Sequence, residues 1–230
     1  MFKNTIINRR VIKKIASALG SLNEQVVYVG GAAVSFYIND PAAEDVRPTG
    51  DVDISLSIAT FGKLEAVREE LVKKGFKQSS LDHVICRFRY EDVKVDVMNT
   101  KAVGWAPANP WFAPGFAKRE TITIDDQQVY ILPLPYFLAS KLVAFNDRGA
   151  IDPRTSHDFE DIVYILDNRM DLVDQLAKAP SDVKPYLIDQ FINVLNNPVK
   201  QEAIYGNLLY ETREERYRMI INKLEKFIYL

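Results

Sequence analysis

The sequence predicts an α+β protein in which a mixed or antiparallel sheet flanked by helices is followed by a helical C-terminal domain. In residues 1–133, short apolar or alternating runs typical of strands are interleaved with runs of helical periodicity. From Pro133 onward the strand pattern disappears, and the long segments place apolar residues at helical spacing. We therefore expect two domains, residues 1–133 and 134–230, divided at the Pro133 to Pro135 segment.

The order of elements follows from these periodicities and from the turn residues between them. Residues 51–58, DVDISLSI, alternate as a half-buried strand does, and residues 61–75 form an amphipathic helical run that ends at a glycine. Residues 84–99 hold two strands around a tight Glu-Asp turn, which predicts an antiparallel hairpin. The other expected elements are a helix at 1–20, a strand at 25–31, a helix at 32–38, a loop at 39–50, an aromatic and proline-rich loop at 104–116, a hairpin at 120–132, and helices at 134–148, 157–168, 184–197 and 214–230.

The composition is that of a globular protein with a substantial core. The 230 residues are 47% hydrophobic and 26% charged, which excludes the disordered class, and the net charge of -2 neither requires nor excludes a nucleic-acid substrate. Cys86 is the only cysteine, which excludes an intramolecular disulfide and fits a reducing compartment. The most apolar stretch, 129–145, is broken by two prolines and Lys141. We expect a soluble, cytoplasmic protein without a membrane segment.

The acidic residues of the 51–58 strand are the first chemical signal. Asp is depleted from strands, yet Asp51 and Asp53 stand one residue apart and so share one face of an extended chain. Two such carboxylates repel unless a cation lies between them, and oxygen ligands of this kind suit Mg²⁺. Asp96, in the run VKVDVMN, faces away from its apolar neighbours. If its strand neighbours the first, three carboxylates converge as two-metal phosphoryl transfer requires.

A pair of glycines lies upstream of the acidic strand. Gly30 and Gly31 end an expected strand and open an expected helix. Backbone N–H groups at such a junction can meet a phosphate, and the missing side chains allow a close approach. A lone Gly-Gly or a lone Asp-x-Asp is a weak signal, but the order strand, Gly-Gly, helix, Asp-x-Asp strand and a third strand Asp is much more specific.

The runs VYVGGAAV, RPTGDVDISL and VKVDVM resemble the nucleotidyltransferase superfamily, whose palm is like that of DNA polymerase beta. The resemblance implies that Gly30 and Gly31 contact a nucleoside triphosphate (NTP) and that Asp51 and Asp53 ligate Mg²⁺. It also implies that Asp96 completes the metal site or acts as the base for the attacking hydroxyl. Two Mg²⁺ ions are expected, with Mn²⁺ as an alternative.

The same resemblance adds two residues and one insertion. Arg47 and Thr49 precede the Asp pair in a pattern frequent among the minimal members of the superfamily, which implies nucleotide binding. Nineteen residues separate Gly31 from Asp51, more than in most relatives. The excess, around DPAAED, should be a loop insertion.

The helical half, with LASKLVAFNDR followed by RTSHDFEDIVYIL, is similar to the AbiEii-like toxin nucleotidyltransferases. This similarity implies that Lys141 reaches the β- and γ-phosphates as a point charge. It places four further charged residues nearby, namely Arg148, Arg154, Asp158 and Asp161. By the same resemblance the acceptor is the 3′ end of a tRNA, and an antitoxin partner is expected.

Three alternatives stay open. The same chemistry on a small molecule such as an antibiotic shares the Gly-Gly and Asp-x-Asp pattern. A non-catalytic nucleotide-binding module would keep the fold without the reaction. A glycosyltransferase with its own Asp-x-Asp metal motif explains neither Gly30-Gly31 nor Asp96.

Other reactive side chains carry weaker signals. For His83 and His157 we favour structural or supporting roles, and Cys86 is expected to be a small buried hydrophobe. Arg87 and Arg89 alternate with apolar residues and so share a face. They either steer an anionic acceptor or lie on a solvated face.

Overall fold

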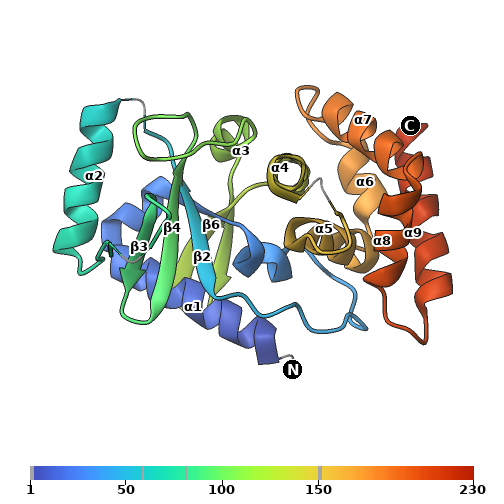
Figure 1. The fold of residues 1–230 in the computed structure, drawn as a ribbon, viewed down its shortest axis with the longest axis horizontal. Coiled ribbons are helices and arrows are strands. Elements are labelled where there is room, and N and C mark those ends of the chain that lie inside the picture. The colour runs from blue at the N-terminus through green and yellow to red at the C-terminus, as the bar shows by residue number, and fades with distance from the viewer. Residues whose placement is uncertain (1–2, 59, 81, 150–151) are drawn as a thin grey trace. The chain divides into compact units, whose positions relative to one another are not determined.

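The structure is a computed structural model that describes residues 3–58, 60–80, 82–149 and 152–230 (Figure 1). The chain forms two compact units. The sheet unit comprises Met1–Ser35 and Asp45–Pro133, and the helical unit comprises Phe36–Glu44 and Leu134–Leu230. The predicted α+β class is confirmed, with a mixed sheet, flanking helices and a helical C-terminal part.

The sheet unit contains six strands, three α-helices and two 3-10 helices in its described residues. In chain order they are α1 (Lys3–Leu19), η1 (Gly20–Gln25), β1 (Val26–Val29), η2 (Gly31–Phe36), β2 (Asp51–Leu56), α2 (Phe61–Lys73), β3 (Arg87–Tyr90), β4 (Val93–Asn99), α3 (Phe112–Ala117), β5 (Glu120–Ile124) and β6 (Gln127–Ile131).

The six strands form one sheet in the order β3-β4-β2-β1-β6-β5. The pairs β2–β4 and β1–β6 are parallel, and the pairs β1–β2, β3–β4 and β5–β6 are antiparallel. Both predicted hairpins are therefore present. The strand that carries Asp96 lies directly beside the strand that carries Asp51 and Asp53. This is the condition under which the sequence analysis expects the three carboxylates to converge.

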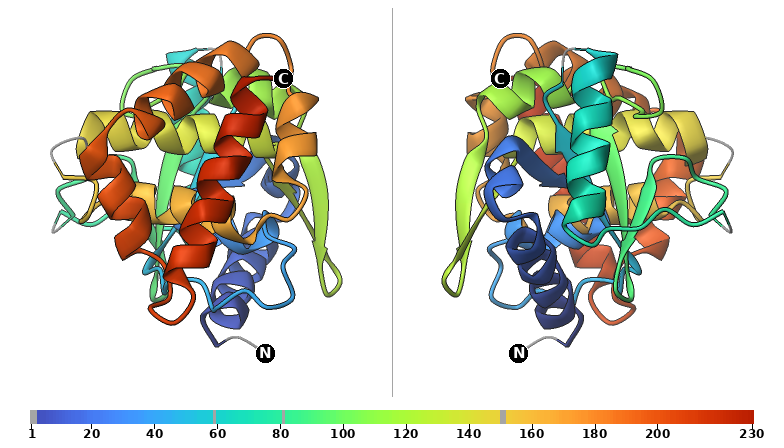
Figure 2. Two further views of the ribbon diagram at one scale, coloured as in Figure 1. Left: turned by 90° about the vertical axis from the view of Figure 1, so that its right-hand side faces the viewer. Right: turned by 90° about the vertical axis from the view of Figure 1, so that its left-hand side faces the viewer.

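One face of the sheet is apolar because alternate residues of each strand point to it. Val52, Ile54 and Leu56 of β2 are almost completely buried there. Figure 2 shows α1 and α2 on one side of the sheet. Phe88 of β3 packs against Trp105 with ring centroids 5.7 Å apart, and the Trp105 indole donates to Glu65 of α2 at 2.7 Å. Burial of this face leaves the opposite, polar face for chemistry.

Two expectations about local structure in the sheet unit are corrected. The sequence predicts a helix at residues 32–38, and the structure has the shorter 3-10 helix η2, which ends at Phe36. 3-10 helices occur mostly in short pieces and connectors of this kind. The expected loop at 104–116 includes the start of helix α3, at Phe112. Residues 39–50 contain no helix or strand, as the predicted loop insertion requires.

The helical unit contains six α-helices and one π-helical segment in its described residues. They are α4 (Leu134–Ala144), the π-helical η3 (Phe145–Gly149), α5 (His157–Asn168), α6 (Leu172–Ala177), α7 (Lys184–Leu195), α8 (Pro198–Gly206) and α9 (Arg213–Ile228).

Helix α4 forms the centre of the helical unit. Tyr136, Phe137, Leu138 and Ala139 are consecutive, so they point in different directions around the helix, and all four are fully buried. A helix that is apolar all round belongs in a core, and α5, α6 and α7 all pack against α4. Among the described residues, no helix has the length and apolar character that a membrane crossing needs.

The helical unit also includes a segment from the first half of the chain, Phe36–Glu44. Tyr37 stacks on Phe137 of α4, with ring centroids 4.1 Å apart. The backbone N–H groups of Asn39 and Asp40 donate to the carbonyl of Asn168 at 3.1 and 3.0 Å. These bonds satisfy a carbonyl at the C-terminal end of α5, which a helix cannot pair internally.

Candidate functional site

The polar face of the sheet carries the three predicted carboxylates on two neighbouring strands. Asp53 of β2 pairs in register with Asp96 of β4, which runs parallel to it. Asp51 lies two residues before Asp53 and so on the same face. The partner of Asp96 on β3 is Arg87, and the partner of Asp53 on β1 is Val29. One row across four strands therefore reads Val29, Asp53, Asp96 and Arg87.

Arg87 binds both oxygens of Asp96. Its Nε is 2.7 Å from Oδ1 and its Nη2 is 2.7 Å from Oδ2, the two-pronged geometry that a guanidinium and a carboxylate favour. The same Nη2 is 3.5 Å from Oδ2 of Asp51. The hydrogen bonds to Asp96 raise the pKa of Arg87. A permanent cation thus lies among the carboxylates.

Asp51 is accessible, with 37% of its side chain exposed. The Thr49 hydroxyl is 3.1 Å from Oδ1 of Asp51 and donates to it, which orients the carboxylate. The predicted nucleotide-binding residue Thr49 therefore contacts the first carboxylate. Arg47 lies earlier in this segment, and its carbonyl accepts a hydrogen bond of 3.4 Å from Asn8 of α1. That bond ties the segment before β2 to the first helix.

Gly30 brings the backbone against Asp53. Its φ is +74°, a left-handed conformation that side chains disfavour. A Cβ atom at this position would lie 2.6 Å from Cγ of Asp53, closer than any real contact. Gly31 follows as the buried first residue of η2. Because η2 is only six residues of 3-10 helix, a phosphate contact here depends on the bare backbone and not on a long helix dipole.

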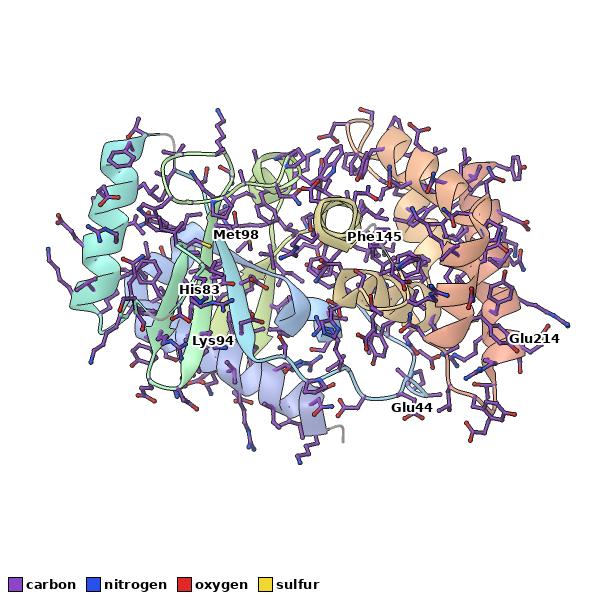
Figure 3. The ribbon with its side chains drawn as sticks, in the orientation of Figure 1. Glu44, His83, Lys94, Met98, Phe145 and Glu214 are labelled. Carbon is purple, nitrogen blue, oxygen red and sulfur yellow. The ribbon has the colours of Figure 1, made fainter. Side chains whose placement is uncertain are left out.

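Basic residues extend the polar face beyond the carboxylates. Lys94, labelled in Figure 3, belongs to β4. It pairs in register with Asp51 on one side and with Arg89 on the other. Arg89 binds both oxygens of Asp82 at 2.8 Å. Arg87 and Arg89 thus share a face, as predicted, but they contact different carboxylates.

Cys86 is buried beside the site. Burial raises the pKa of its thiol to about 11, and the nearby carboxylates of Asp96 and Asp53 act in the same direction. The thiol therefore stays protonated at neutral pH and is a poor nucleophile. This agrees with the role of a small buried hydrophobe expected for Cys86.

In the helical unit, four of the five charged residues predicted to serve the triphosphate form one ion-pair cluster. Lys141 Nζ of α4 is 2.7 Å from Oδ2 of Asp161 and 3.1 Å from Oδ1 of Asp158, both on α5. Arg148 Nη2 is 3.0 Å from the other oxygen of Asp158. Only 6% of the Lys141 side chain and 3% of the Asp161 side chain are exposed. The cluster joins α4 to α5 through a buried ion pair.

Arg154, the fifth of these residues, makes other contacts. Its Nε is 2.9 Å from Oδ1 of Asp152, and its Nη1 is 3.5 Å from Oε1 of Glu202 on α8. About half of the Arg154 side chain is exposed. Asp152 and Glu202 both lie outside the Lys141 cluster.

Asp51 and Asp53 are carboxylates of the kind that could hold a divalent cation on the sheet. Mg²⁺ is usually held by one or two carboxylates, with substrate phosphates and water completing its shell. Asp51 is accessible and oriented, whereas both oxygens of Asp96 are bonded to Arg87. Within residues 3–58, 60–80, 82–149 and 152–230, no group of three or more His, Cys, Asp and Glu side chains is arranged to hold a metal ion. A cation here would need the phosphates of a substrate.

Arg87 is the site residue whose position the sequence analysis did not anticipate. The sequence predicts a face shared with Arg89, which either steers an anionic acceptor or is solvated, and it does not predict the contact with Asp96. A two-residue turn at Glu91 and Asp92 fixes the hairpin register, and this register sets Arg87 opposite Asp96. The length of the hairpin turn was therefore the sequence signal from which the position of Arg87 opposite Asp96 could have been predicted.

Comparison with known proteins gives little beyond the geometry. No model of a known protein family matches the chain, and no curated protein matches it. Among solved structures, the chain is similar to the crystal structure of an antigenic nucleotidyltransferase-like protein from Paracoccidioides brasiliensis. The two are 20% identical, the alignment covers 86% of this chain and 92% of that chain, and the TM-score is 0.48.

The contact between Gly30 and Asp53 predicts an asymmetric response to alanine. Gly30→Ala should lower the free energy of unfolding by about 1–3 kcal/mol, because the left-handed backbone and the Asp53 carboxylate both oppose a Cβ. Gly50→Ala is the matched control, since a Cβ at Gly50 meets nothing within 4 Å. Denaturant unfolding measures both variants. Equal stabilities would contradict the described approach of Gly30 to Asp53.

The buried ion pair predicts a structural cost for removing Lys141. Lys141→Met should lower the free energy of unfolding by about 3 kcal/mol, because the buried Asp161 charge loses its cation. Lys226→Met, an exposed change on α9, should alter it by less than about 0.5 kcal/mol. Thermal and denaturant unfolding give the comparison. If the two variants are equally stable, Lys141 is not the buried partner described above.

Proposed function

We propose that the protein is a divalent-metal-dependent nucleotidyltransferase that moves a nucleoside monophosphate from an NTP to an acceptor hydroxyl. The observation that carries this proposal is the row on the polar face, where Asp53 and Asp96 lie side by side on parallel strands with Asp51 on the same face. Gly30, packed against Asp53 with no side chain of its own, supports it independently. An acidic face that is only solvated would not need the Gly30 backbone to lie so close to Asp53.

The residues on the sheet have separable roles in this reaction. Asp51 and Asp53 would hold Mg²⁺, which supplies positive charge to the triphosphate and to the leaving pyrophosphate when bound. Thr49 keeps the Asp51 carboxylate oriented through its 3.1 Å hydrogen bond. Gly30 has no side chain, so the Asp53 carboxylate lies directly against its backbone, beside the place proposed for the triphosphate. These residues therefore bind and orient the NTP.

Asp96 is the proposed acceptor of the proton from the attacking hydroxyl. Both of its oxygens are bonded to Arg87, but a carboxylate has further lone pairs with which to accept a proton. The same two bonds hold the carboxylate in one orientation. A base held in this way meets the acceptor in a fixed position, which is the geometric requirement of general base catalysis.

The proposed acceptor is the 3′ end of a tRNA, by resemblance to the AbiEii-like toxins, and an antitoxin partner belongs to the same proposal. Lys94, which pairs in register with Asp51, adds a positive charge beside the carboxylates and favours an anionic acceptor over a cationic antibiotic. The phosphate-binding roles of Lys141 and its neighbours remain predictions from the resemblance. Cytoplasmic localisation is likewise proposed.

A transfer assay tests the proposal and its acceptor together. The protein is incubated with each α-labelled NTP, Mg²⁺ and total tRNA, and in parallel with small-molecule acceptors. Label should appear on tRNA. Asp53→Asn should reduce transfer by about a hundred- to a thousandfold, because it removes one carboxylate that positions and neutralises the triphosphate.

The control variant is Asp126→Asn, an exposed acid in the β5–β6 turn that pairs with Lys13 at 2.6 Å. It should transfer at the wild-type rate, and circular dichroism should show both variants folded. If label appears only on small molecules, the acceptor is a small molecule such as an antibiotic and not tRNA. Two outcomes would contradict the proposed enzymatic activity and favour a nucleotide-binding module. One is full transfer activity in Asp53→Asn, and the other is no transfer by the folded wild type to any acceptor.

A further inference from the structure

We propose that β5, an edge strand of the sheet, pairs with β5 of a second copy of this chain and joins two molecules through one continuous sheet. The two strands run antiparallel about a two-fold axis that passes beside Ile122. The inference concerns assembly and goes beyond the proposed function.

The backbone of β5 has a partner strand on one side only. β5 is the last strand in the sheet order, and every residue of the strand pairs with β6. Figure 2 shows this hairpin, in yellow-green, at the outer edge of the sheet. Within the described ranges, the backbone of residues 121–124 bonds to no element other than β6. An edge of this kind is a template on which a further strand can pair.

The turn of the hairpin determines which backbone groups of β5 face outward. The turn has two residues, and the pair that flanks it is Ile124 and Gln127. In such a hairpin the flanking pair exchanges both backbone hydrogen bonds, and bonded pairs then alternate with unbonded pairs along the strands. The outward N–H and C=O groups are therefore those of Thr121 and Thr123, and both residues are exposed.

The opposite edge of the sheet is covered by the chain itself. By the same alternation, Arg89 and Arg87 of β3 face outward. Arg89 donates to the carbonyl of Lys77 at 2.7 Å and accepts from the N–H of Lys77 at 2.8 Å, and the N–H of Arg87 donates to the carbonyl of Val84 at 3.1 Å. No such cover lies along β5 in the described residues, and its run Thr-Ile-Thr-Ile favours strand pairing.

The two ends of β5 carry charges of opposite sign. At the start of the strand, the cations of Lys118 and Arg119 outnumber the carboxylate of Glu120. At its end, residues 125 and 126 are both aspartate, and they share one cation, Lys13 of α1, at 3.0 and 2.6 Å. Two copies of β5 that run antiparallel therefore bring the basic end of each strand against the acidic end of the other.

The backbone restricts the register of this pairing. Outward groups must meet outward groups, so the axis can pass beside Thr121, Ile122 or Thr123 but not between two residues. With the axis beside Ile122, Thr121 of each copy lies opposite Thr123 of the other. These two pairs then exchange four backbone hydrogen bonds, all of them between residues of β5.

The charges select the register centred on Ile122. In this register Arg119 of one copy is level with Asp125 of the other, at both ends of the pair. A shift of one residue toward the turn would set Glu120 beside Asp126, which places like charges together. The opposite shift would move the basic residues away from the turn. Charge complementarity thus identifies a second copy of this chain as the occupant.

Sedimentation velocity of the whole protein, from about 1 to about 300 µM, measures the association. The wild type should pass from monomer to dimer with a Kd on the order of 10 µM, because a single strand pair is a small interface. Thr123→Pro should stay monomeric, since it removes an outward N–H at an edge position where proline is tolerated. Thr123→Val is the matched control, which keeps the N–H and should dimerise as the wild type does.

Cysteine cross-linking tests the register. Ile122→Cys, oxidised with diamide, should form a disulfide between two copies, because opposed residues of an unbonded antiparallel pair lie at a distance that a disulfide can span. Thr121→Cys is the matched control, since its position is more exposed but lies opposite Thr123. It should cross-link at least about tenfold less. Wild-type protein, whose single cysteine is buried, should not cross-link.

Three results would overturn the inference. A wild type that is monomeric at every concentration would exclude the second copy and leave the edge to an extended segment of another protein. A dimer that persists in Thr123→Pro, with circular dichroism showing the variant folded, would exclude β5 as the interface. Equal cross-linking of the two cysteine variants would exclude the register, whether or not the proline variant folds. The transfer assay reads the proposed function separately from all three.

Discussion

The parallel register between β2 and β4 is the constraint on which the rest of the site depends. It sets Asp53 beside Asp96, although 43 positions separate them in the chain (96 minus 53). A slip of one residue would turn Asp96 to the buried face and bring a valine beside Asp53. The apolar residues that alternate with these acids are buried under the helices of the sheet unit. Core packing therefore fixes the register, and the register fixes the chemistry.

Bringing carboxylates together has an electrostatic cost that this structure meets in two ways. On the sheet, Arg87 binds Asp96 and approaches Asp51. In the helical unit, Lys141 lies between Asp158 and Asp161. In both places one cation serves two carboxylates, which is the arrangement that partly buried acids require. The difference is accessibility, since Asp51 keeps 37% of its side chain exposed. Among these carboxylates of the described residues, Asp51 is therefore one that a ligand can reach from solvent.

Much of this could be predicted from the sequence, because strand alternation determines which face a residue occupies. A period of two places Asp51 and Asp53 on one face of their strand. It also places Val95 on the face opposite to that of Asp96. Parallel pairing of β2 with β4 does not follow, because it depends on a crossover through α2 that no local signal specifies. Helix α8 was not predicted, although Asn197 caps it by accepting from two backbone N–H groups and Pro198 is its first residue. The Phe36–Glu44 segment joins the helical unit through bonds to Asn168, which only the three-dimensional structure reveals.

A crystal structure with Mn²⁺ and a non-hydrolysable NTP tests the central claim most directly, because the anomalous signal of manganese locates the ion without reference to activity. The account predicts a manganese peak bonded to the carboxylates of Asp51 and Asp53, with the triphosphate beside Gly30. A nucleotide bound away from this face, with no manganese at either carboxylate, would contradict it.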